Sequence, residues 1–259
     1  MTALENLFKT PGKKLIGYMP AGFPSVEGAK AVINAMVDGG VDAIEVGFPY
    51  SDPVMDGPTI QAAADQALSN GTKASDVIDT LEFSAKLVPS VIMSYWNPIE
   101  RYGVARFTQD LAKAAGSGTI TPDLTVEESN KWLEACKENK VNSIYVVAPS
   151  SNDERLQKVL ANCTGFVYAA SLMGVTGARA QVSNAAENLV SRIRKFTSLP
   201  ICVGLGVSTP DQARDVARYA DGVIVGSAFI NALQKAPNFE AGLESVRNLA
   251  RDLKAGVAA

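Results

Sequence analysis

The amino-acid sequence predicts a single (β/α)8 TIM barrel over residues 1–259, with a short helix at its N-terminus. Short apolar runs typical of strands alternate about eight times with amphipathic stretches typical of helices. No linker-like or low-complexity segment separates these units, and a length of 259 residues suits one such barrel. The same length also suits two domains built on a doubly wound sheet, but the unbroken alternation favours the barrel.

The predicted strands are short apolar runs that are bounded by turn-forming residues, as buried parallel strands are. In chain order they cover residues 15–19, 43–46, 91–94, 119–120, 142–147, 166–169, 201–204 and 222–225. Three of the strand ends carry the same pair of residues, Val followed by Gly. The carboxyl ends of parallel strands share one face of a barrel, and the active sites of such barrels lie there. Functional residues are therefore expected just after the strands.

The predicted helices are amphipathic stretches between the strands. After the N-terminal helix they cover residues 25–37, 59–68, 73–87, 106–115, 126–138, 152–160, 184–196, 210–219 and 239–253. The helix expected at 126–138 has Glu127 and Glu128 in its first turn. Acidic side chains there stabilise the positive end of the helix dipole, which favours a helix start at this point.

Charge and hydrophobicity exclude several classes of partner. The net charge is −3, so no basic surface is expected for nucleic acid or for an anionic membrane. No uncharged apolar run reaches the roughly 18 residues that a membrane span needs. The first residues include Glu5 and lack the basic-then-apolar order of a signal peptide. We therefore expect a cytoplasmic protein that binds neither nucleic acid nor membrane.

The cysteines and the missing histidine limit the chemistry further. Cys136, Cys163 and Cys202 are far apart and odd in number, which indicates a reduced compartment without a disulfide framework. The chain has no histidine and no closely paired cysteines, so we predict no metal site. Without histidine, proton transfer near neutral pH must use carboxylates, tyrosines, lysines or water.

Glu45 is the most informative residue, because it is a carboxylate inside the apolar run 41–47. Desolvating a carboxylate without partners costs several kcal/mol or raises its pKa, which suggests a purpose. Asp56 lies in the loop after the same strand, and the two carboxylates could converge at one pocket. A desolvated Glu45 would then donate and accept protons, while a more solvated Asp56 would stay ionised and accept a hydrogen bond. Alternatively, Glu45 is a structural carboxylate and Asp56 forms a turn before Gly57.

Glycine-rich turns follow the last two predicted strands. Gly204-Leu205-Gly206 and Gly226-Ser227 stand directly before helices. Glycine lets the backbone approach a ligand closely, and free amides at a helix start attract an anion, so these turns could hold a phosphate group. The alternative is that the glycines only make tight turns.

Two further features allow more than one interpretation. The glycine-containing segment 173–179 is either a lid that closes over a pocket or an ordinary surface loop. Tyr18 and Tyr168 stand on strands that end at the same face. They either line a flat apolar slot or simply pack in the core.

Distinctive motifs are spread along the whole chain. They are Tyr18-Met19-Pro20-Ala21-Gly22-Phe23-Pro24, Ile44-Glu45-Val46-Gly47-Phe48-Pro49-Tyr50-Ser51-Asp52-Pro53, Asp56-Gly57-Pro58-Thr59-Ile60-Gln61, Pro122-Asp123-Leu124, Gly174-Val175-Thr176-Gly177, Gly204-Leu205-Gly206-Val207 and Gly226-Ser227. Together these motifs resemble the tryptophan synthase alpha subunit family over essentially the full length. The second and third motifs are the most specific to that family.

The resemblance implies a lyase that cleaves indole-3-glycerol phosphate into indole and glyceraldehyde 3-phosphate during tryptophan biosynthesis, without a metal or organic cofactor. It assigns proton transfer to Glu45, and to Asp56 a hydrogen bond from the indole N–H. The substrate-binding residues that it implies are Tyr18, Ile60 and Tyr168 beside the indole, Thr176 in a closing lid, and Gly177, Gly206, Gly226 and Ser227 around the phosphate.

The resemblance also implies a partner, the beta subunit of tryptophan synthase, in an alpha2beta2 heterotetramer. Pyridoxal phosphate is expected only in that partner. The expected contact surface includes residues 51–56 and residues 95–99, whose aromatic side chains we expect to be exposed.

Two other functions remain as alternatives. A phosphate-sugar isomerase or epimerase would share the glycine turns but usually needs histidines or a metal. A catalytically silent barrel that only regulates another enzyme would have no need for Glu45 and Asp56.

Overall fold

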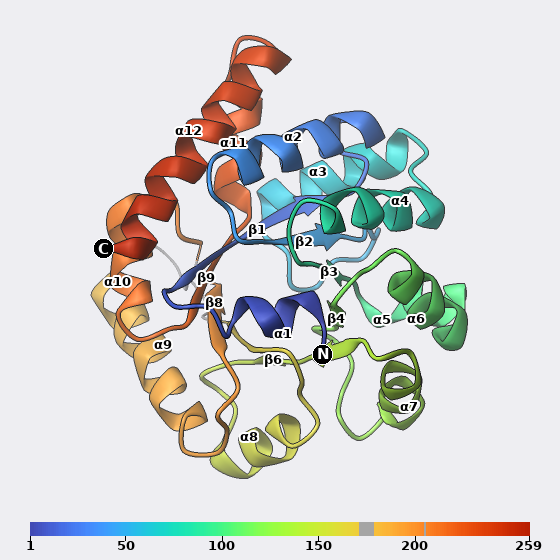
Figure 1. The fold of residues 1–259 in the computed structure, drawn as a ribbon, viewed down its shortest axis with the longest axis vertical. Coiled ribbons are helices and arrows are strands. Elements are labelled where there is room, and N and C mark those ends of the chain that lie inside the picture. The colour runs from blue at the N-terminus through green and yellow to red at the C-terminus, as the bar shows by residue number, and fades with distance from the viewer. Residues whose placement is uncertain (171–178, 205) are drawn as a thin grey trace.

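The strands of the protein form one parallel sheet that curls into a barrel (Figure 1). The computed structural model describes residues 1–170, 179–204 and 206–259. Within them lie β1 (Lys14–Pro20), β2 (Ala43–Gly47), β3 (Ser90–Met93), β4 (Gly118–Ile120), β5 (Asn142–Ile144), β6 (Val146–Val147), β7 (Val167–Ala170), β8 (Ile201–Gly204) and β9 (Gly222–Val225). The helices are α1 (Ala3–Leu7), α2 (Val26–Asp38), α3 (Pro58–Ser69), α4 (Ala74–Ala85), α5 (Trp96–Tyr102), α6 (Val104–Lys113), α7 (Asn130–Asn139), α8 (Asp153–Leu160), α9 (Arg179–Ile193), α10 (Pro210–Ala217), α11 (Ser227–Gln234) and α12 (Phe239–Ala258).

The order of hydrogen-bonded strands is β5-β4-β3-β2-β1-β9-β8-β7-β6. The two ends of this order, β5 and β6, are separated in the chain only by Tyr145. They therefore occupy one strand position, and the ring of eight positions passes through this interrupted strand. The predicted (β/α)8 barrel with a short N-terminal helix is confirmed.

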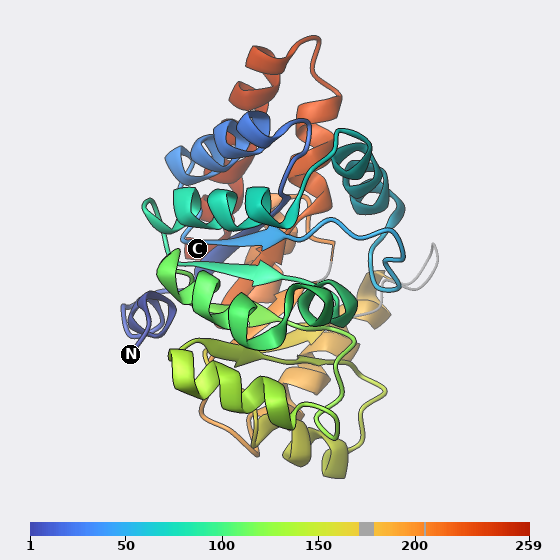
Figure 2. The ribbon, with the colours of Figure 1, turned by 90° about the vertical axis from the view of Figure 1, so that its right-hand side faces the viewer.

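Side chains from alternate strand positions fill the interior of the barrel near α1. This cluster consists of Leu4, Ile16, Ala43, Val91, Ile120, Ile144, Phe166, Cys202 and Ile224. Leu4 is 1% exposed, and the ring of Phe8 lies 5.9 Å from that of Phe166. Figure 1 shows α1 lying across this end of the barrel, and Figure 2 shows the strands pointing away from it. Because α1 closes the amino ends of the strands, their carboxyl ends face the opposite side.

A larger apolar cluster lies between the strands and the surrounding helices. Its largest fully buried side chains include Trp132, Phe107 and Phe229. The indole N–H of Trp132 donates to the hydroxyl of Ser143 over 2.9 Å, so this buried donor is satisfied. The ring of Trp96 meets Trp132 edge-on at 6.0 Å and ties α5 to α7.

Most predicted strands and helices agree with the observed bounds to within a few residues, but several local predictions were wrong. The run 142–147 is interrupted at Tyr145 and forms two short strands. Helix α9 begins at Arg179 rather than at residue 184. Two short helices, α5 and α11, were not predicted. The seven residues of α5 hold too few turns for a clear amphipathic period.

The predicted helix at 126–138 begins only at Asn130, so Glu127 and Glu128 do not lie in its first turn. The carboxylate of Glu127 instead lies 2.5 Å from Arg155 and 2.8 Å from the amine of Lys158, both on α8. The Glu128 carboxylate accepts a hydrogen bond from the Thr125 hydroxyl over 3.0 Å. Contacts outside the helix thus replace the contact with the helix dipole that the sequence suggested.

The packing of α1 against the amino end of the barrel predicts a contribution to the free energy of unfolding. Leu4→Ala should lower the free energy of unfolding by about 2–5 kcal/mol, because it leaves a cavity in a close-packed cluster. Leu87→Ala is the matched control, since Leu87 is 40% exposed and should change the free energy by less than about 0.5 kcal/mol. Urea unfolding of both variants checks this. Equal effects of the two substitutions would contradict the role assigned to α1.

Candidate active site

A cavity of about 440 Å³ opens at the carboxyl ends of the strands. Its lining includes every predicted site residue that the structure describes: Tyr18, Glu45, Asp56, Ile60, Tyr168, Gly206, Gly226 and Ser227. Residues from β1, β2, β7 and α11, far apart in the sequence, thus meet in one place. The two remaining predicted residues, Thr176 and Gly177, lie outside the described residues.

The cavity lining also contains residues that the sequence reasoning missed. Among them, Met93 ends β3 and Ile224 stands on β9. The alternation of side chains along a strand, together with the rule that barrel sites lie at strand ends, is the signal that could have found them.

Glu45 lies in the middle of β2 and is 2% exposed. Its neighbours in register are Tyr18 on β1 and Val91 on β3. Its Oε1 atom has no hydrogen-bond partner among the described residues. Burial without a compensating partner raises the pKa of this carboxyl to about 8, because the charged form loses its hydration. Glu45 is therefore mostly protonated at neutral pH.

Asp56 lies in a different environment at the same cavity. It is only partly buried, and burial raises its pKa, whereas a hydrogen bond with the side chain of Tyr95 lowers it. The backbone carbonyl of Asp56 accepts a hydrogen bond from the side-chain amide of Gln61 over 2.7 Å. The opposing effects on Asp56 make it the more easily ionised of the two carboxylates. This is the contrast of environments that separates an acid from an ionised acceptor.

Two tyrosines form apolar walls of the cavity. Burial is the largest cause that raises the pKa of both Tyr18 and Tyr168, so both phenols stay neutral. Each hydroxyl lies against a glycine of the neighbouring strand. A Cβ atom on Gly47 would lie 2.3 Å from the Tyr18 hydroxyl oxygen, and one on Gly204 would lie 2.3 Å from that of Tyr168. These two glycines therefore leave the space that the tyrosine rings occupy.

Backbone also lines part of the cavity. Gly226 is the N-cap of α11 and provides no side-chain hydrogen bond to the first turn of the helix. A Cβ atom at this position would lie 3.2 Å from the Tyr18 ring, so the backbone itself comes close to the cavity. Gly206 has a φ of +65°, a conformation that favours glycine. Exposed amides at a helix start, beside close-lying backbone, are suited to an anion.

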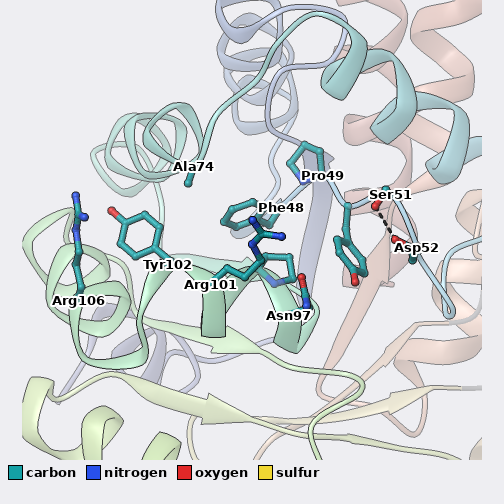
Figure 3. Close-up of a pocket in the computed structure, with 11 residues that line it drawn as sticks. Phe48, Pro49, Ser51, Asp52, Ala74, Asn97, Arg101, Tyr102 and Arg106 are labelled. Carbon is teal, nitrogen blue, oxygen red and sulfur yellow. Dashed lines mark hydrogen bonds between the residues drawn. The ribbon is translucent and has the colours of Figure 1, made fainter.

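A second hollow, of about 730 Å³, lies beside this cavity on the surface (Figure 3). It is lined by Phe48, Pro49, Tyr50, Ser51, Asp52, Ala74, Asn97, Pro98, Arg101, Tyr102 and Arg106. In Figure 3, Arg106 and Tyr102 stand at one end and Ser51 and Asp52 at the other. The Arg106 guanidinium lies 5.0 Å from the centre of the Tyr102 ring.

The prediction that the aromatic residues in 95–99 are exposed was wrong in part. Tyr95 is 2% exposed, and Trp96 is half-buried. Ile99 in the same segment is fully buried. Tyr95 packs against the ring of Tyr50 at 5.4 Å, which takes it out of the surface. The exposed large apolar residues near the cavity are Val54 and Met55, which are 77% and 48% exposed.

The fold and the cavity define a class: a TIM-barrel enzyme whose strand-end pocket combines two unlike carboxylates. Comparisons with known proteins identify the family. The family model described as "Tryptophan synthase alpha chain" matches residues 4–258. Tryptophan synthase alpha chains of Streptomyces avermitilis and Nocardia farcinica are 54% and 53% identical to this chain, covering 94% and 98% of it and 88% and 95% of the relatives.

Solved structures agree with this match. A tryptophan synthase structure from Mycobacterium tuberculosis superposes with a TM-score of 0.92 at 45% identity, covering 100% of this chain and 99% of the other. The alpha subunit from Legionella pneumophila gives a TM-score of 0.90 at 30% identity, covering 99% and 98%. The chain belongs to the tryptophan synthase alpha chain family.

Membership in this family gives the activity. The protein is a lyase that cleaves indole-3-glycerol phosphate in tryptophan biosynthesis, and its family implies a beta-subunit partner. Over the residues that the structure describes, no helix has the length and apolar character needed to cross a membrane.

The raised pKa of Glu45 predicts a pH-dependent contribution to stability. Burial raises this pKa from 4.5 to about 8, so the folded state binds more protons than the unfolded state between these values. The stabilisation is complete below about pH 4.5 and is lost as the pH rises through about 8. Glu45→Gln removes the ionisation. The unfolding free energy of this variant relative to the wild type should rise over this range by up to about 5 kcal/mol.

Chemical denaturation of both proteins at several pH values measures this difference. A difference between variant and wild type that is independent of pH would contradict the environment assigned to Glu45.

Proposed function

We propose that Glu45 transfers the protons in this cleavage and that Asp56 stabilises the positive charge that develops on the indole ring. The observation that carries this proposal is the contrast between the two carboxylates at one cavity. Glu45 is buried, has a free Oε1 among the described residues and has a pKa of about 8. Asp56 is less buried than Glu45; burial raises its pKa, and the side chain of Tyr95 opposes this rise. One group is thus suited to hold a proton, and the other to hold a charge.

In the proposed mechanism the Glu45 carboxyl first donates its proton to C3 of the indole ring. The ring becomes a cation whose charge is shared with its nitrogen, and the N–H donates a stronger hydrogen bond to the Asp56 carboxylate. The Glu45 carboxylate then accepts the proton of the glyceryl hydroxyl next to the ring. A carbonyl forms there as the carbon–carbon bond breaks, and the bonding electrons return to the ring. Indole and glyceraldehyde 3-phosphate are released, and Glu45 is protonated again.

The two sides of the cavity suit the two parts of this substrate. The indole ring would lie against Tyr18, Ile60 and Tyr168, which bury apolar surface. The phosphate would accept hydrogen bonds from backbone amides around Gly206, Gly226 and Ser227, where the α11 dipole favours an anion. We also assign Gly177 to the phosphate and Thr176 to a closing lid, on the motif that carries them.

The proposed steps transfer two protons through Glu45 and break one carbon–carbon bond heterolytically while a carbonyl forms, so Glu45 and the substrate supply every proton and electron needed. We therefore propose that this chain uses no metal and no organic cofactor, and that pyridoxal phosphate belongs to the beta subunit alone.

We propose that the assembly is an alpha2beta2 heterotetramer in which the beta subunit covers the surface hollow and the neighbouring loop 51–56. The support is the exposed apolar pair Val54 and Met55 in this loop, together with the exposed cation Arg101 in the hollow. Arg101 has no ion-pair partner within the described part of the chain, so a partner's acidic group could pair with it. We also propose a cytoplasmic location, which the three free, buried cysteines support.

Removing the proton donor should abolish most of the activity. Glu45→Gln should lower the kcat for indole formation by about 100- to 10,000-fold, because an amide cannot transfer the proton. In the wild type, kcat/KM should fall as the pH rises through about 8, where Glu45 loses its proton. Indole release measured from pH 6 to 10 checks both statements. The control is Glu82→Gln, a carboxylate-to-amide change on the exposed face of α4. Undiminished turnover by Glu45→Gln would contradict the assignment of Glu45 as the proton donor.

The surface hollow should contribute to association with the beta subunit. Arg101→Glu should weaken that association about tenfold, because it places a negative charge where the partner presents one. The control is Arg251→Glu, which reverses an exposed charge on α12. Titration of each variant with the beta subunit, followed by calorimetry, measures the dissociation constants. Equal weakening by the two variants would contradict the location of the interface.

A further inference from the structure

Tyr95 is a buried aromatic residue that the proposed mechanism does not use directly. It follows β3 and is the N-cap of α5. The hydroxyl of Ser94 donates to the carbonyl of Tyr95 over 2.9 Å. The next amide, that of Trp96, donates to both carboxylate oxygens of Asp123, over 2.9 and 3.1 Å. With its backbone held on both sides and its side chain 2% exposed, Tyr95 is fixed to the barrel.

The hydroxyl of Tyr95 faces the loop that carries Asp56. It accepts a hydrogen bond from the backbone amide of Met55 over 2.9 Å, although the side chain of Met55 itself is largely exposed. The Tyr95 ring packs on Tyr50, at the beginning of the same loop. Tyr95, which follows β3, thus contacts both the beginning and the end of the loop that follows β2.

The side chain of Tyr95 also acts on the Asp56 carboxyl as a hydrogen-bonding group, which lowers the pKa of that carboxyl against the effect of burial. A tyrosine hydroxyl can accept from one group while it donates to another, so both bonds can form together. On the other side of Asp56, Gln61 holds the backbone carbonyl. The Met55–Asp56 segment is therefore held between Tyr95 and α3, while the preceding residues of the loop extend into solvent.

We propose that Tyr95 is a positioning residue: its hydroxyl holds the Met55 amide and the Asp56 carboxylate together, so that Asp56 stays aimed at the cavity. The proposal rests on the proposed role of Asp56. It adds a residue outside the cavity lining, on another strand end, whose hydroxyl sets the orientation and the charge of the catalytic carboxylate.

Tyr95→Phe tests this, because it keeps the ring and its contact with Tyr50 but removes the hydroxyl. We expect the kcat for indole formation to fall about ten- to hundredfold, as for loss of one hydrogen bond to a charged group. The KM should change much less, since the bond from the indole N–H to Asp56 strengthens mainly in the transition state. The acidic limb of the pH profile should move to higher pH, because the Asp56 carboxyl loses a bond that lowers its pKa.

The control is Tyr145→Phe, which removes a hydroxyl from a tyrosine that is also 2% exposed but lies outside the cavity lining. It should leave the acidic limb in place. In an Asp56→Asn background, Tyr95→Phe should add less than about a twofold loss, because the two residues act through one interaction. A loss as large as in the wild-type background would show that Tyr95 acts elsewhere and would overturn the proposal.

Amide hydrogen exchange provides a readout that is independent of activity. The Met55 amide should exchange at least about tenfold faster in Tyr95→Phe than in the wild type or in Tyr145→Phe, because its acceptor is gone. Unchanged exchange together with an unchanged pH profile would refute the proposal. Full activity of Asp56→Asn would instead refute the proposed function, and the exchange of Met55 would still test whether Tyr95 holds the loop.

Discussion

The burial of one carboxylate, that of Glu45, is the constraint on which the rest of the site depends. A side chain on the middle of β2 points into the barrel, where its neighbours are other strands rather than water. The resulting pKa of about 8 keeps a proton on Glu45 at neutral pH, in a protein that has no histidine to perform this task. The barrel thus keeps this carboxyl protonated by withholding hydration, at a cost in stability that grows as the pH rises.

The remainder of the fold places other groups around the cavity that Glu45 lines. Helix α1 and the apolar cluster beneath it close the amino end of the barrel, and the cavity that the described residues form lies at the carboxyl ends of the strands. There, glycines on β2 and β8 make room for two tyrosine rings, and the start of α11 offers backbone amides. These apolar rings and backbone amides suit a substrate with an apolar ring and a phosphate, and both carboxylates line the same cavity.

The sequence predicts those parts of the site that depend on local pattern. Glu45 stands out because it interrupts an apolar run, and Gly226 because it stands between a strand and a helix. What could not be predicted depends on contacts between distant segments. The partial burial of 95–99 depends on two such contacts. Tyr95 packs on Tyr50, and the carboxylate of Asp123 accepts a hydrogen bond from the first backbone amide of α5. The late start of α7 has the same kind of cause, since Glu127 pairs with α8 instead of stabilising its own helix. The roles of the site residues come from the family motifs and remain proposals to be tested on this chain.

The central claim, that Glu45 is protonated at neutral pH, is tested most directly by observing its ionisation. Carbon-13 NMR of carboxyl-labelled glutamate, with Glu45→Gln to assign the signal, follows this one group from pH 4 to 10. We predict a titration midpoint near 8, far above that of exposed glutamates, which titrate near 4.3. A midpoint below about 6 would mean that Glu45 is ionised at neutral pH, and would contradict its role as the proton donor.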